Sequence, residues 1–173
     1  MPTFQSPSDD VKDDIRTAVI RFEVDAPTDQ PAIESASEKN SVARTQRDTR
    51  HEIYFVEVGE TGAQDPSDGL LARFASHQPQ VKRYSESKIE SKAIPELNID
   101  ENKASMMYHV RDKATGKIGA SLHIRRILLT GPNRAEVDGS LHSGGLYGAG
   151  YIWIAVCENG HWTIKRRRTT WMS

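Results

Sequence analysis

Histidine and carboxylate side chains are the candidates for acid–base chemistry in this sequence. Glu136 and Asp138 lie two residues apart in a segment that alternates apolar and polar residues, so a β-strand would place both carboxylates on one face. His109 and His123 fall in neighbouring extended segments. A carboxylate with a raised pKa beside an imidazole suits general acid–base catalysis. We favour the alternative that residues 135–141 turn their apolar side to the core, which leaves both acids facing solvent.

The histidines and the cysteine show no spacing typical of a metal site. The six histidines are His51, His77, His109, His123, His142 and His161. None is paired with a second histidine, a cysteine or an acid at helical ligand spacing, and Cys157 is the only cysteine. A single cysteine excludes an internal disulfide and permits a reducing compartment. The sequence therefore predicts no metal, no cofactor and a cytoplasmic location.

A glycine-rich run and an arginine-rich run lie near the C-terminus. Residues 144–150 lack the Lys-Ser/Thr of a phosphate-binding loop and lead into an extended run, so we interpret them as a bend in a sheet. Residues 165–168 are Lys-Arg-Arg-Arg, and on a strand their charges would point to opposite faces. Basic residues also discourage edge-to-edge pairing of a strand. Nucleic-acid binding is therefore disfavoured.

Composition indicates a single domain over residues 1–173. Hydrophobic residues make up 36% of the chain, and 23 Lys and Arg nearly balance 24 Asp and Glu, which gives no global field toward nucleic acid or membrane. No apolar run approaches the roughly 20 residues of a membrane span. The N-terminus lacks the basic start and the apolar core of a signal peptide. We expect no membrane partner.

The N-terminal part combines one clear helix with a polar segment. Ser8 is a helix cap, and apolar residues recur at helical spacing to Phe22, which predicts a helix over 9–24. Residues 26–50 contain two prolines and no aromatic residue, which predicts a polar loop or disordered insertion. A short polar helix over 32–44 is the alternative.

Residues 51–102 predict short elements. Residues 51–58 are rich in β-formers and end before a glycine, which indicates a strand. Asp65 and Pro66 predict a helix start with Asp65 as the cap, and this helix should end near His77. Residues 81–84 suggest a short strand, and the polar residues 86–102 a connecting loop.

Residues 105–166 predict an antiparallel meander. Strands are expected over 105–110, 118–127 and 135–141, followed by a hairpin of two β-branched and aromatic runs. Asn159 and Gly160 join these runs, and Asn-Gly is a strong signal for a two-residue hairpin turn. About four long strands result.

Four segments carry a family resemblance: 118–128, 135–141, 147–157 and the Gly-Trp-type turn at 158–164. Their order resembles the nuclear transport factor 2-like (cystatin-like α+β roll) superfamily, of the uncharacterised small bacterial type. The resemblance implies an α+β fold: a strongly bent antiparallel sheet of about four to six strands packed on two or three helices as a cone-shaped roll. The superfamily includes isomerases and dehydratases as well as proteins without known activity, so fold alone does not give function.

Two functional hypotheses follow. The first is a non-catalytic module that binds a small-molecule ligand in the cone or associates with itself as a homodimer. Aromatic residues would then line or fill the cone: Phe22, Phe55, Tyr108, Tyr151 and Trp153. The second is a small-molecule lyase or isomerase that uses His109 or His123 with Glu136 or Asp138. The absence of a recognisable catalytic motif favours the first hypothesis.

Overall fold

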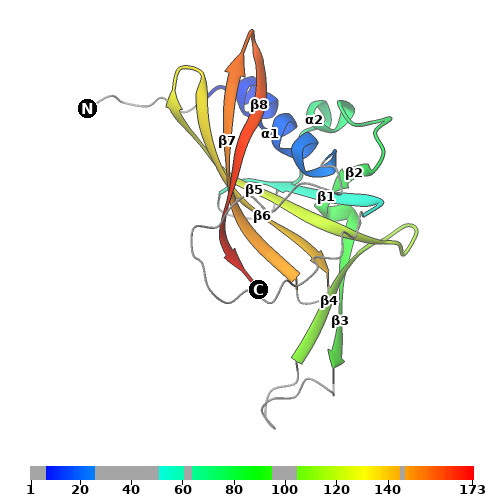
Figure 1. The fold of residues 1–173 in the computed structure, drawn as a ribbon. Coiled ribbons are helices and arrows are strands. Elements are labelled where there is room, and N and C mark those ends of the chain that lie inside the picture. Colours follow the sequence, from blue (N-terminus) through cyan, green and yellow to red (C-terminus); the bar gives the residue numbers. More distant parts are fainter. Residues whose placement is uncertain (1–6, 26–50, 61–63, 95–104, 145–146) are drawn as a thin grey trace.

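One mixed sheet with two α-helices beside it makes up the described part of the chain. The computed structural model describes residues 7–25, 51–60, 64–94, 105–144 and 147–173. Within them the sheet has eight strands (Figure 1). The polar segment predicted at 26–50 lies outside the described residues.

The first helix, α1 (Asp9–Val24), has the predicted bounds. The Ser8 hydroxyl accepts a hydrogen bond from the Val11 amide at 3.5 Å, and Asp9 and Asp10 lie in the first turn, where the helix dipole favours acids. The stripe of α1 that faces the sheet includes Ile15 and Val19, both fully buried. Local capping and periodicity therefore suffice to specify this helix.

The second helix, α2 (Asp68–Ala72), is shorter than predicted and has a different cap. The Ser67 hydroxyl accepts the hydrogen bond from the Leu70 amide at 3.1 Å, whereas Asp65 accepts one from the Ser85 amide at 3.0 Å. The prediction that Asp65 caps a helix reaching His77 is wrong. A contact 20 residues away takes the Asp65 carboxylate, and sequence spacing gives no sign of it.

The eight strands follow the order β2-β1-β5-β6-β7-β8, and β4 pairs with both β3 and β5. Their bounds are β1 (Ile53–Val58), β2 (Gln80–Arg83), β3 (Ser87–Ile94), β4 (Ser105–Asp112), β5 (Ile118–Gly131), β6 (Arg134–Gly144), β7 (Tyr147–Glu158) and β8 (His161–Met172). A single 3₁₀ turn, η1 (Tyr84–Glu86), joins β2 to β3. β1 runs parallel to β2 and β5, and β5 to β8 form an antiparallel meander.

The predicted α+β roll of four to six antiparallel strands on two or three helices is wrong for this chain. The sheet has eight strands and is mixed, and the described residues form only two α-helices. Part of the error is β3, which was expected to be a loop because it is polar. It forms a strand because it pairs along its whole length with β4, as a ribbon that projects from the body (Figure 1). Local composition does not encode such a pairing.

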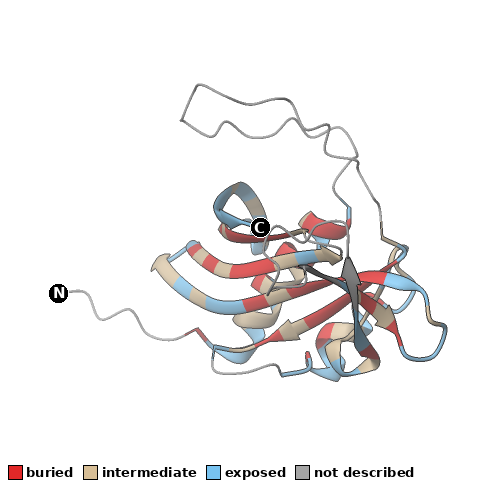
Figure 2. Cartoon of the chain, turned by 90° about the horizontal axis from the view of Figure 1, so that it is seen from below, coloured by how far each residue is buried: buried red, intermediate tan, exposed pale blue. Residues whose placement is uncertain are grey.

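The hydrophobic core lies between α1 and one face of the sheet, here called the inner face. Buried residues alternate along the strands (Figure 2). On β6, Ala135 and Val137 are fully buried, and they belong to one cluster with Ile15 and Val19 of α1. Side chains alternate between the two faces of a strand. Glu136 and Asp138, which alternate with these buried residues, therefore lie on the opposite face, here called the outer face.

Glycines allow close packing on both faces. On the inner face, a Cβ added at Gly139 would lie 2.9 Å from Cζ3 of Trp153 and 2.1 Å from the His123 carbonyl oxygen. On β7, a Cβ at Gly150 would lie 2.1 Å from Nε1 of Trp171. At the β7–β8 turn, Asn159 and Gly160 have φ values of 52° and 78°, as a type I′ hairpin requires.

Candidate functional site

The layer between α1 and the sheet is filled by aromatic side chains around one buried acid. Trp153 is fully buried and Tyr151 is nearly so. The Trp153 indole N–H donates to Oε1 of Glu23 at 2.7 Å, and the Arg167 guanidinium lies 3.0 Å from Oε2 of the same carboxylate. A buried acid with these partners is fully hydrogen-bonded, which makes it a structural element of the core.

Electrostatics hold Arg167 charged in this layer. Burial by itself would lower the pKa of Arg167, but the Glu23 carboxylate raises it above its usual value. Its guanidinium carbon lies 4.4 Å from the ring centroid of Tyr151, within cation–π range. Burial raises the pKa of Tyr151, so its hydroxyl stays protonated. Arg167 therefore ties the β8 strand to α1.

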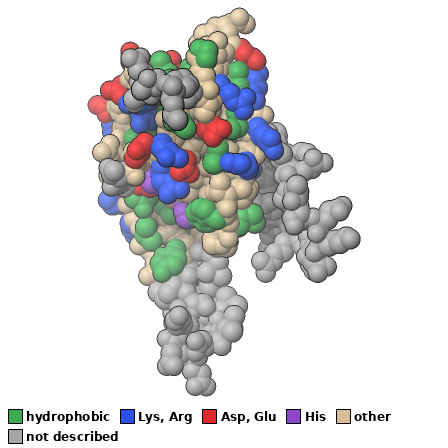
Figure 3. All heavy atoms as spheres, turned by 90° about the vertical axis from the view of Figure 1, so that its left-hand side faces the viewer, with side chains coloured by type: hydrophobic (Ala, Val, Ile, Leu, Met, Phe, Trp, Pro, Cys, Tyr) green, Lys and Arg blue, Asp and Glu red, His purple; other side chains and the backbone are tan. Residues whose placement is uncertain are grey.

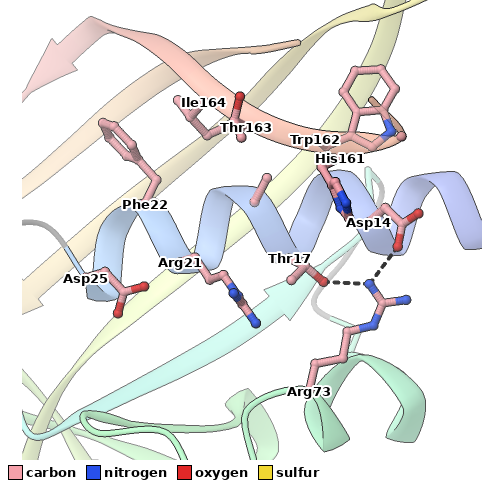
Figure 4. Close-up of a pocket in the computed structure, with 12 residues that line it drawn as sticks. Asp14, Thr17, Arg21, Phe22, Asp25, Arg73, His161, Trp162, Thr163 and Ile164 are labelled. Atoms are coloured by element: carbon pink, nitrogen blue, oxygen red, sulfur yellow. Dashed lines mark hydrogen bonds and ion pairs between the residues drawn. The ribbon is translucent and has the colours of Figure 1, made fainter. Parts of the chain in front are cut away.

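A groove of about 910 Å³ lies outside this layer, between α1, the residue after α2 and the first residues of β8. We call it the α1–β8 groove (Figure 4). The side chains labelled in the close-up are those of Asp14, Thr17, Arg21, Phe22, Asp25, Arg73, His161, Trp162, Thr163 and Ile164. The volume of the α1–β8 groove falls in the range of small-molecule sites.

The two sides of the groove differ in chemistry. Phe22, Trp162 and Ile164 supply an apolar side and pack partly against the core. Polar side chains of α1 and Arg73 supply the other (Figure 4). The guanidinium of Arg73 is already held by Asp14 at 2.7 Å and by the Thr17 hydroxyl at 3.0 Å.

Arg21 is the groove cation for which the described residues supply no such partner. At one end of the groove the Asp25 carboxylate lies 2.8 Å from Nε2 of His77. The exposed Arg21 guanidinium lies between the Arg73–Asp14 pair and the His77–Asp25 pair along α1. Among the described residues it forms no hydrogen bond and no ion pair. A free guanidinium beside an apolar wall can bind an anionic group whose carbon skeleton packs on that wall.

The structure does not bring the four predicted acid–base residues together as predicted. Glu136 and Asp138 lie on the outer face of β6, and Asp138 pairs with Arg125 at 3.3 Å. His123 lies on the same face of β5, where its hydrogen-bonding partner is Glu57 of β1. His109 lies on β4, where Nδ1 would approach a Cβ at Gly144 to 3.3 Å.

Glu57 and His123 form a partly buried pair on the outer face. Oε1 of Glu57 lies 2.9 Å from Nδ1 of His123, and Nε2 faces the Gly59 carbonyl oxygen at 3.4 Å. Burial raises the pKa of Glu57, an effect that His123 partly offsets. The Glu57 charge helps to raise the pKa of Tyr84, and His123 helps to lower that of His142, so these groups lie close by. The carboxylate orients the imidazole, as acid–base sites require.

Replacing Glu57 by glutamine tests the cost of this buried charge. Folding raises the pKa of Glu57 above its usual value of 4.5. The Glu57 side chain therefore stabilises the folded state at pH values below 4.5, and this stabilisation is lost as the pH rises through the folded-state pKa. The difference in Tm between Glu57→Gln and the wild-type protein (variant minus wild type) is therefore expected to be more positive at pH 7 than at pH 4. Thermal unfolding by circular dichroism measures it, with Glu52→Gln at an exposed ion pair as the matched control. A more negative difference at pH 7 would show that the ion pair with His123 dominates.

The five predicted lining residues do not share one cavity. Phe22 borders the α1–β8 groove, and Tyr151 and Trp153 are in the core. Phe55 lies in a second buried cluster on the outer face, and Tyr108 is 53% exposed on β4. The layer between α1 and the sheet is therefore a filled core, and the α1–β8 groove lies outside it.

Sequence reasoning missed Glu57, Glu23, Arg21 and Trp162 as site residues. Glu57 is the one charged residue within the β1 strand, and Glu23 lies on the buried stripe of α1 at four-residue spacing from Val19. A lone charge in an apolar pattern signals a buried partner, which could have identified both acids. Arg21 and Trp162 carry no such signal, because their proximity depends on how β8 lies beside α1.

Comparisons with known proteins assign no family. No family model, no curated protein and no solved structure matches the chain. Over the described ranges, no cluster of three or more His, Cys, Asp or Glu is arranged to hold a metal ion, and no helix there has the length and apolar character to cross a bilayer. The resemblance to the nuclear transport factor 2-like superfamily and the cytoplasmic location stay predictions.

Proposed function

We propose that this protein is a non-catalytic binding module that holds a small amphiphilic carboxylate in the α1–β8 groove. The observation that carries the proposal is the Arg21 guanidinium, which has no partner among the described residues and lines the same groove as the apolar side chains of Phe22 and Trp162 (Figure 4). A carboxylate would form charge-assisted hydrogen bonds with Arg21, and a flat hydrocarbon group would pack on the rings.

The filled interior supports this location of the ligand. Trp153 and Tyr151 occupy the space between α1 and the sheet, and Glu23 is saturated by Trp153 and Arg167. A ligand there would have to displace a core aromatic residue, whereas the groove is accessible without any rearrangement. The lyase or isomerase hypothesis, with Glu136 or Asp138 as the acid, stays a prediction, although the acid beside His123 in the structure is Glu57.

Naphthalene-2-acetate is a suitable probe, because it joins a flat hydrocarbon to one carboxylate. In an NMR titration we expect binding that shifts amide resonances of α1 and of the start of β8. Naphthalene-2-acetamide, the neutral analogue, should bind at least about tenfold more weakly, which corresponds to about 1.4 kcal/mol. Arg21→Gln should weaken binding of the acid by a similar factor, since hydrogen bonds to charged groups contribute about 1.5–3 kcal/mol.

A matched control separates charge from position. Lys117→Gln removes a cation that pairs with Glu52 at the start of β5, away from the groove, and should leave the affinity unchanged. Equal binding of the acid and the amide to the wild-type protein, or shifts confined to other elements, would refute the proposed function. Unchanged circular-dichroism spectra would establish that the Arg21 variant is folded.

A further inference from the structure

The outer face of the sheet carries two rows of side chains that cross four strands in register. The first row is Leu128, Glu136, Ile154 and Arg166, and the second is Arg126, Asp138, Ile152 and Arg168. Their inner-face neighbours Val137 and Trp153 are fully buried, so these rows point away from α1. Read along the strands, the rows give an acidic column on β6, an apolar column on β7 and a basic column on β8.

Most of these charges have no partner among the residues that the structure describes. Glu136, Arg166 and Arg168 form no ion pair or hydrogen bond through their side chains among the described residues, whereas Asp138 is held by Arg125 at 3.3 Å. The backbones of the acidic and basic columns are two strands apart, about 9.5 Å, and among the described residues no ion pair bridges them across the isoleucine column. The isoleucine column between them is partly exposed, and Leu128 is 45% exposed.

The columns are complementary to a second copy of the same face. A twofold axis along β7 would set Ile152 and Ile154 against the same residues of a second copy. The same rotation exchanges the strands on either side of β7. The acidic column of β6 in each copy would therefore face the basic column of β8 in the other copy. In such an isologous contact each pair is formed in both directions.

We propose that this protein forms a homodimer through the outer face of β6, β7 and β8, with β7 on the twofold axis. Glu136 then meets Arg166 of the second copy, and Asp138 meets its Arg168. β7 has 12 residues and spans about 40 Å, and three strands are about 10–15 Å wide. These dimensions give an area of about 400–600 Å², which places the contact among the smaller specific interfaces, below the roughly 800 Å² per partner of a standard one.

Mixed charge on the surface favours a second copy over a partner of one charge sign. Figure 3 shows one side of the molecule, where acidic, basic and hydrophobic side chains are interspersed. A nucleic acid would require a basic surface without the acids of β6. The dimer is independent of the proposed ligand, because the α1–β8 groove lies on the inner side of the sheet.

Charge reversal tests the pairing directly. In sedimentation velocity of the full chain over a concentration series, the wild-type protein should sediment as a dimer. Glu136→Arg and Arg166→Glu should each raise the dimer dissociation constant at least about tenfold, because like charges then face each other. The double variant Glu136→Arg/Arg166→Glu should return it to within about threefold of wild type, since the opposite charges meet again across the axis.

Two further variants complete the experiment. Ile154→Asp should abolish the dimer, whereas Arg21→Glu, on the inner side, should leave it intact. Circular dichroism confirms that each variant is folded. A wild-type monomer at all concentrations would overturn the proposal, and so would a dimer that withstands Ile154→Asp or a double variant no stronger than the single ones.

Discussion

Gly139→Ala is expected to prevent stable folding. A Cβ at this position would lie 2.1 Å from the His123 carbonyl oxygen on β5 and 2.9 Å from Trp153 on β7. The oxygen is backbone and belongs to a paired strand, so the sheet itself would have to separate. Overpacked cores lose about 1–3 kcal/mol when side chains alone can move, and we expect a larger loss here, about 4 kcal/mol or more.

Urea unfolding followed by circular dichroism measures this loss. Gly69→Ala is the matched control, because a Cβ there meets nothing within 4 Å and the residue is helical. This control should be neutral or stabilising by up to about 1 kcal/mol. A Gly139→Ala protein with wild-type stability would show that β5 and β6 are farther apart than described.

Arg167→Met is expected to destabilise the protein by about 3–5 kcal/mol, the usual cost of leaving one member of a buried ion pair without its partner. Glu23 keeps a side-chain exposure of only 3% in the core, and Arg167 is the cation that neutralises it. Methionine preserves most of the volume, so the loss reports the uncompensated carboxylate and not a cavity. Thermal or urea unfolding at neutral pH measures the difference.

A double-mutant cycle isolates the pair. Glu23→Gln retains an acceptor for the Trp153 indole N–H but removes the charge. The variant Glu23→Gln/Arg167→Met should therefore be more stable than Arg167→Met alone, with a coupling energy of about 1–3 kcal/mol. Additive losses in the two single variants would show that the carboxylate and guanidinium do not interact energetically.

Alternation along single strands could be predicted, but pairings between distant strands could not. The pattern of β6 predicted that Ala135 and Val137 face the core and that Glu136 and Asp138 do not, and burial agrees. The loop predicted over 86–102 contained β3, because its polar residues form a strand only through pairing with β4. The parallel pairing of β1 with β5 joins residues more than 60 positions apart, and this made the predicted antiparallel roll wrong.

The candidate site residues show the same contrast between local sequence pattern and contacts of distant segments. His123 was recognised as a candidate by its residue type, but its partner is Glu57, 66 residues earlier, and not an acid of the neighbouring strand. Glu23 and Arg167 are 144 residues apart and meet only because β8 packs beside α1. Residue type therefore identifies candidates, while the packing of distant segments selects the pairs.

By itself, the sequence determined the Ser8-capped helix α1, the two faces of β6 and the Asn159-Gly160 turn. Each of these depends on neighbours within a few residues, where backbone geometry and burial periodicity leave a direct pattern. Only the tertiary structure decided the mixed sheet, the buried Glu23–Arg167 pair, the α1–β8 groove and the charged columns of the outer face. These features arise from contacts between distant segments, whose free energy appears only when the whole sheet has assembled.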